Sequence, residues 1–129
     1  MTTKTKFYRI PGHESANAKI AIERRIFDGE ERGITSVRLI SYSTDVLGIR
    51  LTKGGLYDLY INGLFSMTTR KHISWFCRLY PGTLTYHVFK WFIEEGLLRS
   101  DNARRASIAE LDQVLKIADI VEHSGKQIR

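Results

Sequence analysis

Three short segments between residues 34 and 67 alternate apolar and polar side chains, and this pattern constrains the fold more than any other feature of the sequence. The apolar members of the three runs are Val37, Leu39, Leu47, Ile49, Leu51, Tyr57, Leu59 and Ile61. Side chains two residues apart lie on the same face of a strand, so each run predicts a strand with one buried face. Gly54-Gly55 and Asn62-Gly63 favour tight hairpin turns. We therefore expect an antiparallel meander of three to four strands over residues 34–67.

Helices are expected before and after this meander. Residues 14–27 can form either a helix or a strand, and their length and alanine content favour the helix. Thr69 is suited to cap a helix over residues 70–80, which Pro81-Gly82 would end. The segment 84–95 is apolar on most of its faces, which is typical of a helix buried in a core or against a partner.

The last helix is marked by a capping box, in which the side chains of Ser107 and Glu110 each bond the other residue's backbone N–H group. The chain of 129 residues is long enough for one domain with a single core. We therefore expect one α+β domain over residues 1–129, with an N-terminal helix and three C-terminal helices packed on the meander. The polar ends, residues 1–6 and 125–129, are expected to fray.

Cysteine content and hydropathy indicate a cytoplasmic protein. Cys77 is the only cysteine of the sequence, so no disulfide within the chain is expected. The polar residues 1–6 are not followed by the apolar run of a signal peptide. The sequence also lacks the run of about 18 apolar residues that a membrane-spanning helix needs, so no membrane partner is expected.

The chain carries 20 basic and 14 acidic residues, and the basic excess is concentrated in its middle. The seven basic residues of the segment 34–92 are Arg38, Arg50, Lys53, Arg70, Lys71, Arg78 and Lys90. The same segment holds only Asp45 and Asp58 as acidic residues. A basic field favours nucleic acid or an acidic protein surface as partner, although a basic domain without such a partner has the same composition.

Residues suited to catalysis or metal binding are sparse. Cys77 lies on the apolar face of its expected helix, where a cysteine is usually an inert core residue. Glu94 and Glu95 are neighbours on a helix and face different directions, so they make a poor acid–base pair. The four histidines lie on separate elements without the spacing of zinc ligands. We therefore expect no enzyme activity, no metal and no cofactor.

The first candidate binding site is the start of the helix after the meander. Thr69, Arg70, Lys71 and His72 fall in its first turn, where cations oppose the helix dipole. An anion bound there would reverse that cost, because free backbone N–H groups and the cations would converge on it. The alternative is that these cations point into water and only keep the domain soluble.

The second candidate site is the outward face of the meander. If the apolar residues of the strands face the helices, then Arg38, Arg50 and Tyr60 lie together on the opposite face. Arginines with an aromatic ring on an open sheet can bind single-stranded nucleic acid by pairing with phosphates and stacking with bases. The alternative, which the single aromatic residue favours, is an ordinary solvated face on which Asp58 pairs with an arginine across the strands.

Part of the sequence is similar to a pattern in small proteins of phages and mobile elements, which reads SYxT, then LYxN, then YSxTTxxH. The matching runs are Ser41-Tyr42-Ser43-Thr44, Leu59-Tyr60-Ile61-Asn62 and Phe65-Ser66-Met67-Thr68-Thr69-Arg70-Lys71-His72. The chain departs from the pattern at Phe65, where tyrosine is usual. The resemblance implies a phage or mobile-element setting. Small basic proteins of that setting often block host defence, anti-CRISPR proteins among them, or assist nucleic-acid transactions.

The leading hypothesis is a binding protein of phage type, without enzyme activity, that docks its basic middle on nucleic acid or on a nucleoprotein complex of the host cell. An anti-CRISPR-like inhibitor is one form of it. The predicted contact residues are Arg38, Arg50, Lys53, Tyr60, Thr69, Arg70, Lys71, His72 and Arg78. The alternative is an assembly module that forms a homodimer through Phe89, Trp91 and Ile93 of the apolar helix.

Overall fold

The computed structural model of the chain describes residues 2–13, 15–62, 66–91 and 103–129. Within them, the strands are β1 (Thr2–Arg9), β2 (Ala18–Phe27), β3 (Glu30–Ser41), β4 (Thr44–Leu51), β5 (Tyr57–Ile61), β6 (Ala103–Arg105) and β7 (Gln127–Ile128). The helices are α1 (Met67–Cys77), α2 (Leu84–Trp91) and α3 (Ile108–Ser124). The strands form one antiparallel sheet in the order β6-β5-β4-β3-β2-β1-β7.

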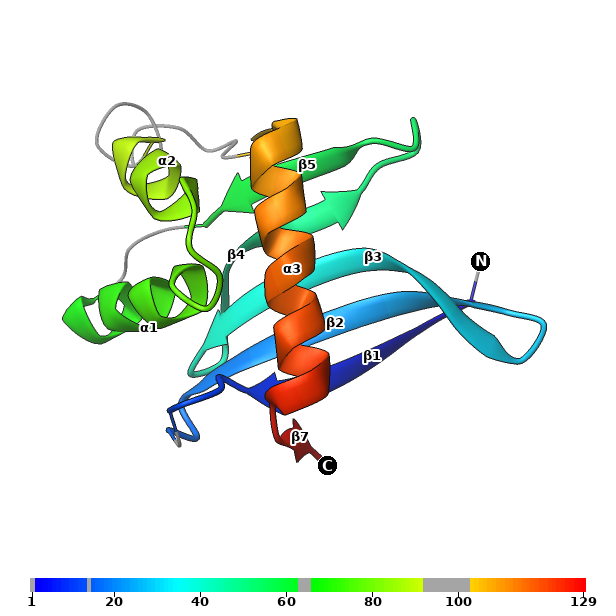
Figure 1. The fold of residues 1–129 in the computed structure, drawn as a ribbon, viewed down its shortest axis with the longest axis horizontal. Coiled ribbons are helices and arrows are strands. Elements are labelled where there is room, and N and C mark those ends of the chain that lie inside the picture. The colour runs from blue at the N-terminus through cyan, green and yellow to red at the C-terminus, as the bar shows by residue number, and fades with distance from the viewer. Residues whose placement is uncertain (1, 14, 63–65, 92–102) are drawn as a thin grey trace.

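The helices lie on one side of this sheet. α3 crosses the strands, and α1 and α2 lie beside it near the β3–β4 turn (Figure 1). The predicted meander is present as β3, β4 and β5, and its alternation gives each strand a buried face, as expected. The inward residues Val37, Leu39, Leu47, Ile49, Leu59 and Ile61 are all buried in the core against the helices. The mixed α+β class is therefore confirmed, and the face turned away from the viewer in Figure 1 carries no described helix.

The helix predicted over residues 14–27 is wrong, because most of this segment is the strand β2. Its residue Ile20 pairs with Tyr8 of β1 on one side and with Leu39 of β3 on the other. Pairing on both sides gives period-two burial to a segment whose composition also suits a helix. Asp28 and Gly29, both at positive φ, close the β2–β3 hairpin with the backbone that a tight two-residue turn requires.

The sheet is larger than the three to four strands predicted, because both ends of the chain join it. Residues 2–9 form β1, and residues 127–128 form β7, which pairs with Phe7 and Tyr8. The fraying predicted for residues 1–6 and 125–129 stays a prediction. The three residues of β6 extend the opposite edge next to β5. The polar composition of these segments hides their strand character, which comes from backbone pairing with a neighbour.

The helices differ from the prediction mainly at their ends. Ser66, and not Thr69, caps α1, since its side chain accepts a hydrogen bond from the backbone N–H of Thr69. α1 ends at Cys77, three residues before the predicted Tyr80. The predicted capping box of α3 is confirmed, with Ser107 and Glu110 bonded reciprocally. The predicted end of the helix over 84–95 lies outside the described residues.

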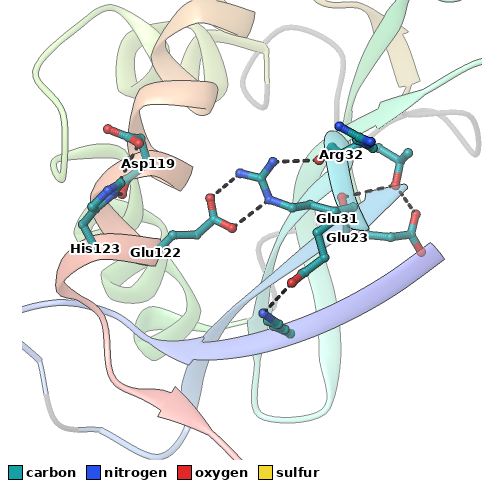
Figure 2. Close-up of polar contacts among 9 residues, drawn as sticks. Glu23, Glu31, Arg32, Asp119, Glu122 and His123 are labelled. Atoms are coloured by element: carbon teal, nitrogen blue, oxygen red, sulfur yellow. Dashed lines mark hydrogen bonds and ion pairs between the residues drawn. The ribbon is translucent and has the colours of Figure 1, made fainter. Parts of the chain in front are cut away.

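Side chains of α3 make polar contacts that fix the helix relative to the rest of the chain, and two of them involve Glu122 and Gln113. Arg24 of β2 donates from Nε and a terminal nitrogen to the two carboxylate oxygens of Glu122, at 2.9 and 2.5 Å (Figure 2). Gln113 accepts a hydrogen bond from the backbone N–H of Leu84 at 2.8 Å and donates to the carbonyl oxygen of Tyr80 at 3.0 Å. The first contact joins α3 to the sheet, and the second joins it to the connection between α1 and α2. None of the described helices is long and apolar enough to cross a membrane.

Candidate functional site

The candidate site is built on the outward face of the sheet, around a glycine. Gly48 of β4 pairs with Arg38 of β3 on one side and with Tyr60 of β5 on the other. A Cβ atom at Gly48 would lie 2.9 Å from the Tyr60 hydroxyl and 2.3 Å from the carbonyl oxygen of Val37. Because this position has no side chain, the Tyr60 ring can extend across β4 toward β3.

The Tyr60 side chain is held by contacts at its hydroxyl and over its ring. Its hydroxyl donates to the carboxylate of Asp45, with distances of 2.7 and 2.8 Å to the two oxygens. The guanidinium of Arg50 lies over its ring, with Cζ 4.9 Å from the ring centroid. Burial and the hydrogen bond to Asp45 raise the pKa of Tyr60 far above its ordinary value, so the phenol stays neutral.

The placement of Tyr60 corrects its predicted role as a stacking group. Only 4% of the residue is exposed, because Arg50 covers its ring. A base cannot stack on Tyr60 unless Arg50 leaves. Arg50 is exposed, however, and a guanidinium supported by an aromatic ring offers its other face to solvent.

Two adjoining hollows on this face form what we call the basic groove. One, of about 320 Å³, is lined by Arg38, Asp45, Tyr60 and Asn62, and the other, of about 420 Å³, by Arg25, Thr35, Lys53 and Gly55, among others. Glu23, Ser36 and Arg50 line both hollows. The groove therefore runs across β2, β3 and β4, and Arg50 lies where the two hollows meet.

The charges of the groove are only partly neutralised. Arg38 is 3.7 Å from Asp45, and Glu23 accepts a hydrogen bond from Thr35 at 2.6 Å. Arg25, Arg50 and Lys53 form no ion pair within the described part of the chain. A surplus of positive charge therefore remains along the groove.

Asp58 pairs with an arginine other than its neighbour Arg50. It lies opposite Arg50 in the β4–β5 register, yet its carboxylate pairs with Arg105 of β6, whose Nε donates to Asp58 Oδ1 at 3.2 Å. Asp58 does pair with an arginine across strands, as the solvated-face reading expects, but that arginine comes from a strand the sequence did not reveal. Arg50 is left without a carboxylate partner among the described residues.

The remaining predicted contacts lie apart from the groove, on α1 or at its end. Arg70 and Lys71 are exposed on this helix and Arg78 is exposed at its C-cap, on the side of the sheet that carries the helices. Thr69 and His72, with 3% and 1% of their surface exposed, are interior residues and cannot contact a partner in this fold. The predicted cations therefore form two groups on different sides of the sheet and do not converge on one site.

His72 has a structural partner that explains its burial. The hydroxyl of Ser41 lies 2.7 Å from His72 Nδ1 and 3.3 Å from the hydroxyl of Thr69. Burial, with the charge of Lys71 nearby, lowers the pKa of His72 below its ordinary value. The motif residues Ser41, Thr69 and His72 thus join β3 to α1.

The residues predicted for self-association receive little support. Phe89 packs partly buried against the core, so it does not form a free apolar patch. The side chain of Trp91 and the whole of Ile93 lie outside what the structure describes. Cys77 is buried, and burial raises the pKa of its thiol to about 12, which disfavours the reactive thiolate. Among the described residues, no three His, Cys, Asp or Glu side chains gather as a metal site.

Sequence reasoning missed several residues of the groove. Glu23 and Arg25 belong to β2, which was expected to be a helix, and Asp45 was counted only as a charge. The alternation around Gly48 was the one available signal, since a glycine on the outward face of a central strand marks a close approach. No family model matches the sequence, and no curated protein or solved structure proves similar to it.

Proposed function

We propose that the chain binds single-stranded nucleic acid along the basic groove, with Arg50 as the central contact. The observation that carries this proposal is the position of Arg50, which is exposed, supported by the Tyr60 ring and free of any carboxylate partner among the described residues. Single strands bind to open sheet faces through phosphate contacts with cations and through base stacking on aromatic rings or guanidinium planes.

The chemistry of the groove divides these two tasks among its residues. Arg25 and Lys53 line the second hollow together with Arg50 and are suited to contact phosphates. Arg50 is suited to stack with a base, because Tyr60 holds its guanidinium from below. Asp45 fixes Tyr60 and balances Arg38, which keeps the platform rigid.

The resemblance to phage and mobile-element proteins supports the setting for this activity. In that setting the single strand is either free or exposed in a host nucleoprotein, and the anti-CRISPR-like form of the hypothesis corresponds to the second case. The basic charge of the groove argues against mimicry of nucleic acid, because a mimic carries negative charge.

The test measures the binding of a dye-labelled oligothymidylate by fluorescence anisotropy at low salt. Its length of about 10 nucleotides lies within the site sizes of single-strand binding folds. Loss of one stacked base costs about 1–3 kcal/mol, so Arg50→Ala should weaken binding by roughly tenfold or more. Arg32→Ala is the matched control, since Arg32 is an exposed arginine outside the groove that pairs with Glu30 (Figure 2 shows Arg32).

Salt dependence gives a second readout of the same complex. Each phosphate contact on a single strand contributes about −0.7 to the slope of log K against log salt, so Lys53→Ala, which removes a proposed phosphate contact, should make the slope shallower by about that amount. Equal affinities for Arg50→Ala and Arg32→Ala, or no binding by the unaltered protein at low salt, would rule out the groove as a nucleic-acid site.

A further inference from the structure

A second group of residues with stacking chemistry lies beside the β3–β4 turn, outside the basic groove. It comprises His13 from the β1–β2 connection, Tyr42 from the turn, and His72 and Trp75 from α1, and we call it the aromatic cluster. His13 stacks on Trp75, with ring centroids 3.9 Å apart and an angle of 11° between the planes. His72 lies 5.1 Å from Trp75 and 6.0 Å from Tyr42, tilted to both.

Tyr42 is the exposed member of this cluster, and its backbone conformation is unfavourable. Its φ is +57°, in the left-handed region, where a bulky side chain is rare. The other described non-glycine residue with positive φ is Asp28, a residue type that tolerates this conformation well. A hydrogen bond of 2.6 Å from the Tyr42 N–H to the carbonyl oxygen of Asn17 holds the turn in place.

The strain at Tyr42 does not serve to bury its ring. The residue is 51% exposed, so most of the apolar ring remains in water. A glycine or asparagine at this position would form the same turn with less strain. The sequence therefore keeps an aromatic ring at a position where folding gains little from it, which is the pattern expected of a contact residue.

The cluster is flanked by cations without carboxylate partners. Lys71 Nζ lies 5.5 Å from the Trp75 ring centroid, and Arg70 is exposed next to it in sequence. Neither forms an ion pair within the described part of the chain, and the first turn of α1 holds no acidic residue. Aromatic rings interleaved with unpaired cations match a nucleic-acid strand, which offers bases and phosphates in alternation.

We infer that the aromatic cluster is a second contact for the same single strand, in which Tyr42 stacks with a base and Lys71 and Arg70 contact phosphates. This inference rests on the proposed function of the groove. The two surfaces meet at the β3–β4 hairpin, because Tyr42 lies in its turn and Asp45 of the groove is the second residue of β4. The β3–β4 turn lies next to α1 (Figure 1), so a strand that followed the groove past Asp45 and around this turn would reach the cluster.

The experiment compares two lengths of labelled oligothymidylate, about 4 and about 16 nucleotides, which bracket the site sizes of single-strand binding folds. The short strand occupies the groove alone, whereas the long strand reaches the cluster. Tyr42→Asn should weaken binding of the long strand by roughly tenfold and leave the short strand unaffected. Tyr42→Phe, which keeps the ring, is the matched control and should bind both strands as the unaltered protein does.

Thermal unfolding of the same variants separates a contact role from a structural role. Asparagine suits the left-handed turn, so Tyr42→Asn should unfold at the same or a higher temperature while it binds the long strand less well. A structural role for the ring predicts the reverse, with a lowered midpoint and unchanged affinity, and that result would overturn the inference.

The outcomes for the two sites are distinguishable. If Arg50→Ala lost binding of both strand lengths and Tyr42→Asn bound both as the unaltered protein does, the groove would be supported as a binding site and the cluster would be rejected. If Arg50→Ala bound normally and Tyr42→Asn bound the long strand less well, the groove would be rejected as a binding site and Tyr42 would be supported as a contact. A polyglutamate peptide that displaces the long strand as well as unlabelled oligothymidylate does would also overturn the inference, because a peptide has no bases to stack.

Discussion

Glu110 is the carboxylate on which the stability of this fold should depend most strongly. Only 1% of the residue is exposed, yet it accepts hydrogen bonds from two guanidinium nitrogens of Arg104, at 2.8 and 2.6 Å. It also accepts one from the backbone N–H of Ser107 at 2.9 Å, and its second oxygen lies 3.2 Å from His87 Nδ1. One side chain thus connects the start of α3 to β6 and α2.

These contacts lower the pKa of Glu110 by more than burial of the charge raises it. Burial by itself would raise the pKa of Glu110, but the Arg104 and Ser107 hydrogen bonds lower it from 4.5 to about 2. Because the pKa is depressed in the folded state, the stabilisation is complete above the unfolded pKa near 4.5 and is lost as pH falls toward 2. By linkage, it amounts to about 3 kcal/mol at neutral pH and about 1 kcal/mol at pH 3.

The prediction is tested with Glu110→Gln, which has nearly the same volume but cannot carry the charge. At pH 7 the variant should lose about 3 kcal/mol, or roughly 10 °C in midpoint for a domain of this size, and the deficit should shrink by about 2 kcal/mol at pH 3. Urea unfolding followed by circular dichroism at both pH values gives these free energies. Asp112→Asn, at an exposed carboxylate of the same helix, should change stability little at either pH. A deficit that is the same at pH 7 and pH 3 would refute the argument, because linkage requires it to follow the titration.

Two further predictions concern the core and the groove. Gly48→Ala should cost about 1–3 kcal/mol in urea unfolding, because the new Cβ would meet the Val37 carbonyl oxygen and the Tyr60 hydroxyl. Gly54→Ala should cost little, because its Cβ would meet only Thr52 Oγ1, at an ordinary contact distance of 4.0 Å. Equal losses in the two alanine variants would contradict the close approach at Gly48. The thiol of Cys77, with its pKa raised to about 12, should react with an aromatic disulfide reagent only as fast as the protein opens, and labelling at the rate of a free thiol in native buffer would show that it is accessible.

The strands that were predicted correctly share one property, which is that their alternation is visible in a few adjacent residues. Val37 and Leu39, then Leu47 and Ile49, then Leu59 and Ile61, face the core as their period-two spacing requires. The segment of β2 was predicted to be a helix because Ile20, Ala21 and Ile22 suit both a helix and a strand. Only its partners β1 and β3 decide between them.

The candidate site was predicted in part, for the same reason. Alternation places Arg38, Arg50 and Tyr60 on one face, and the structure brings these three residues together. The alternation does not indicate that Arg50 covers Tyr60 or that Asp45 accepts a hydrogen bond from the Tyr60 hydroxyl. It also does not indicate that Arg25 of β2 lines the same groove. Those contacts join different strands, and their geometry depends on register and on the missing side chain at Gly48.

The sequence by itself determined the central hairpins, the capping box of α3 and the basic character of the middle of the chain, since each depends on residues within a few positions of one another. The tertiary structure decided that residues 18–27 form a strand, that His72 is interior and that the cations separate into two groups. Each of these outcomes depends on which distant segments pair. The free energy of that pairing comes from side chains that are buried between segments far apart in the sequence, which no local pattern identifies.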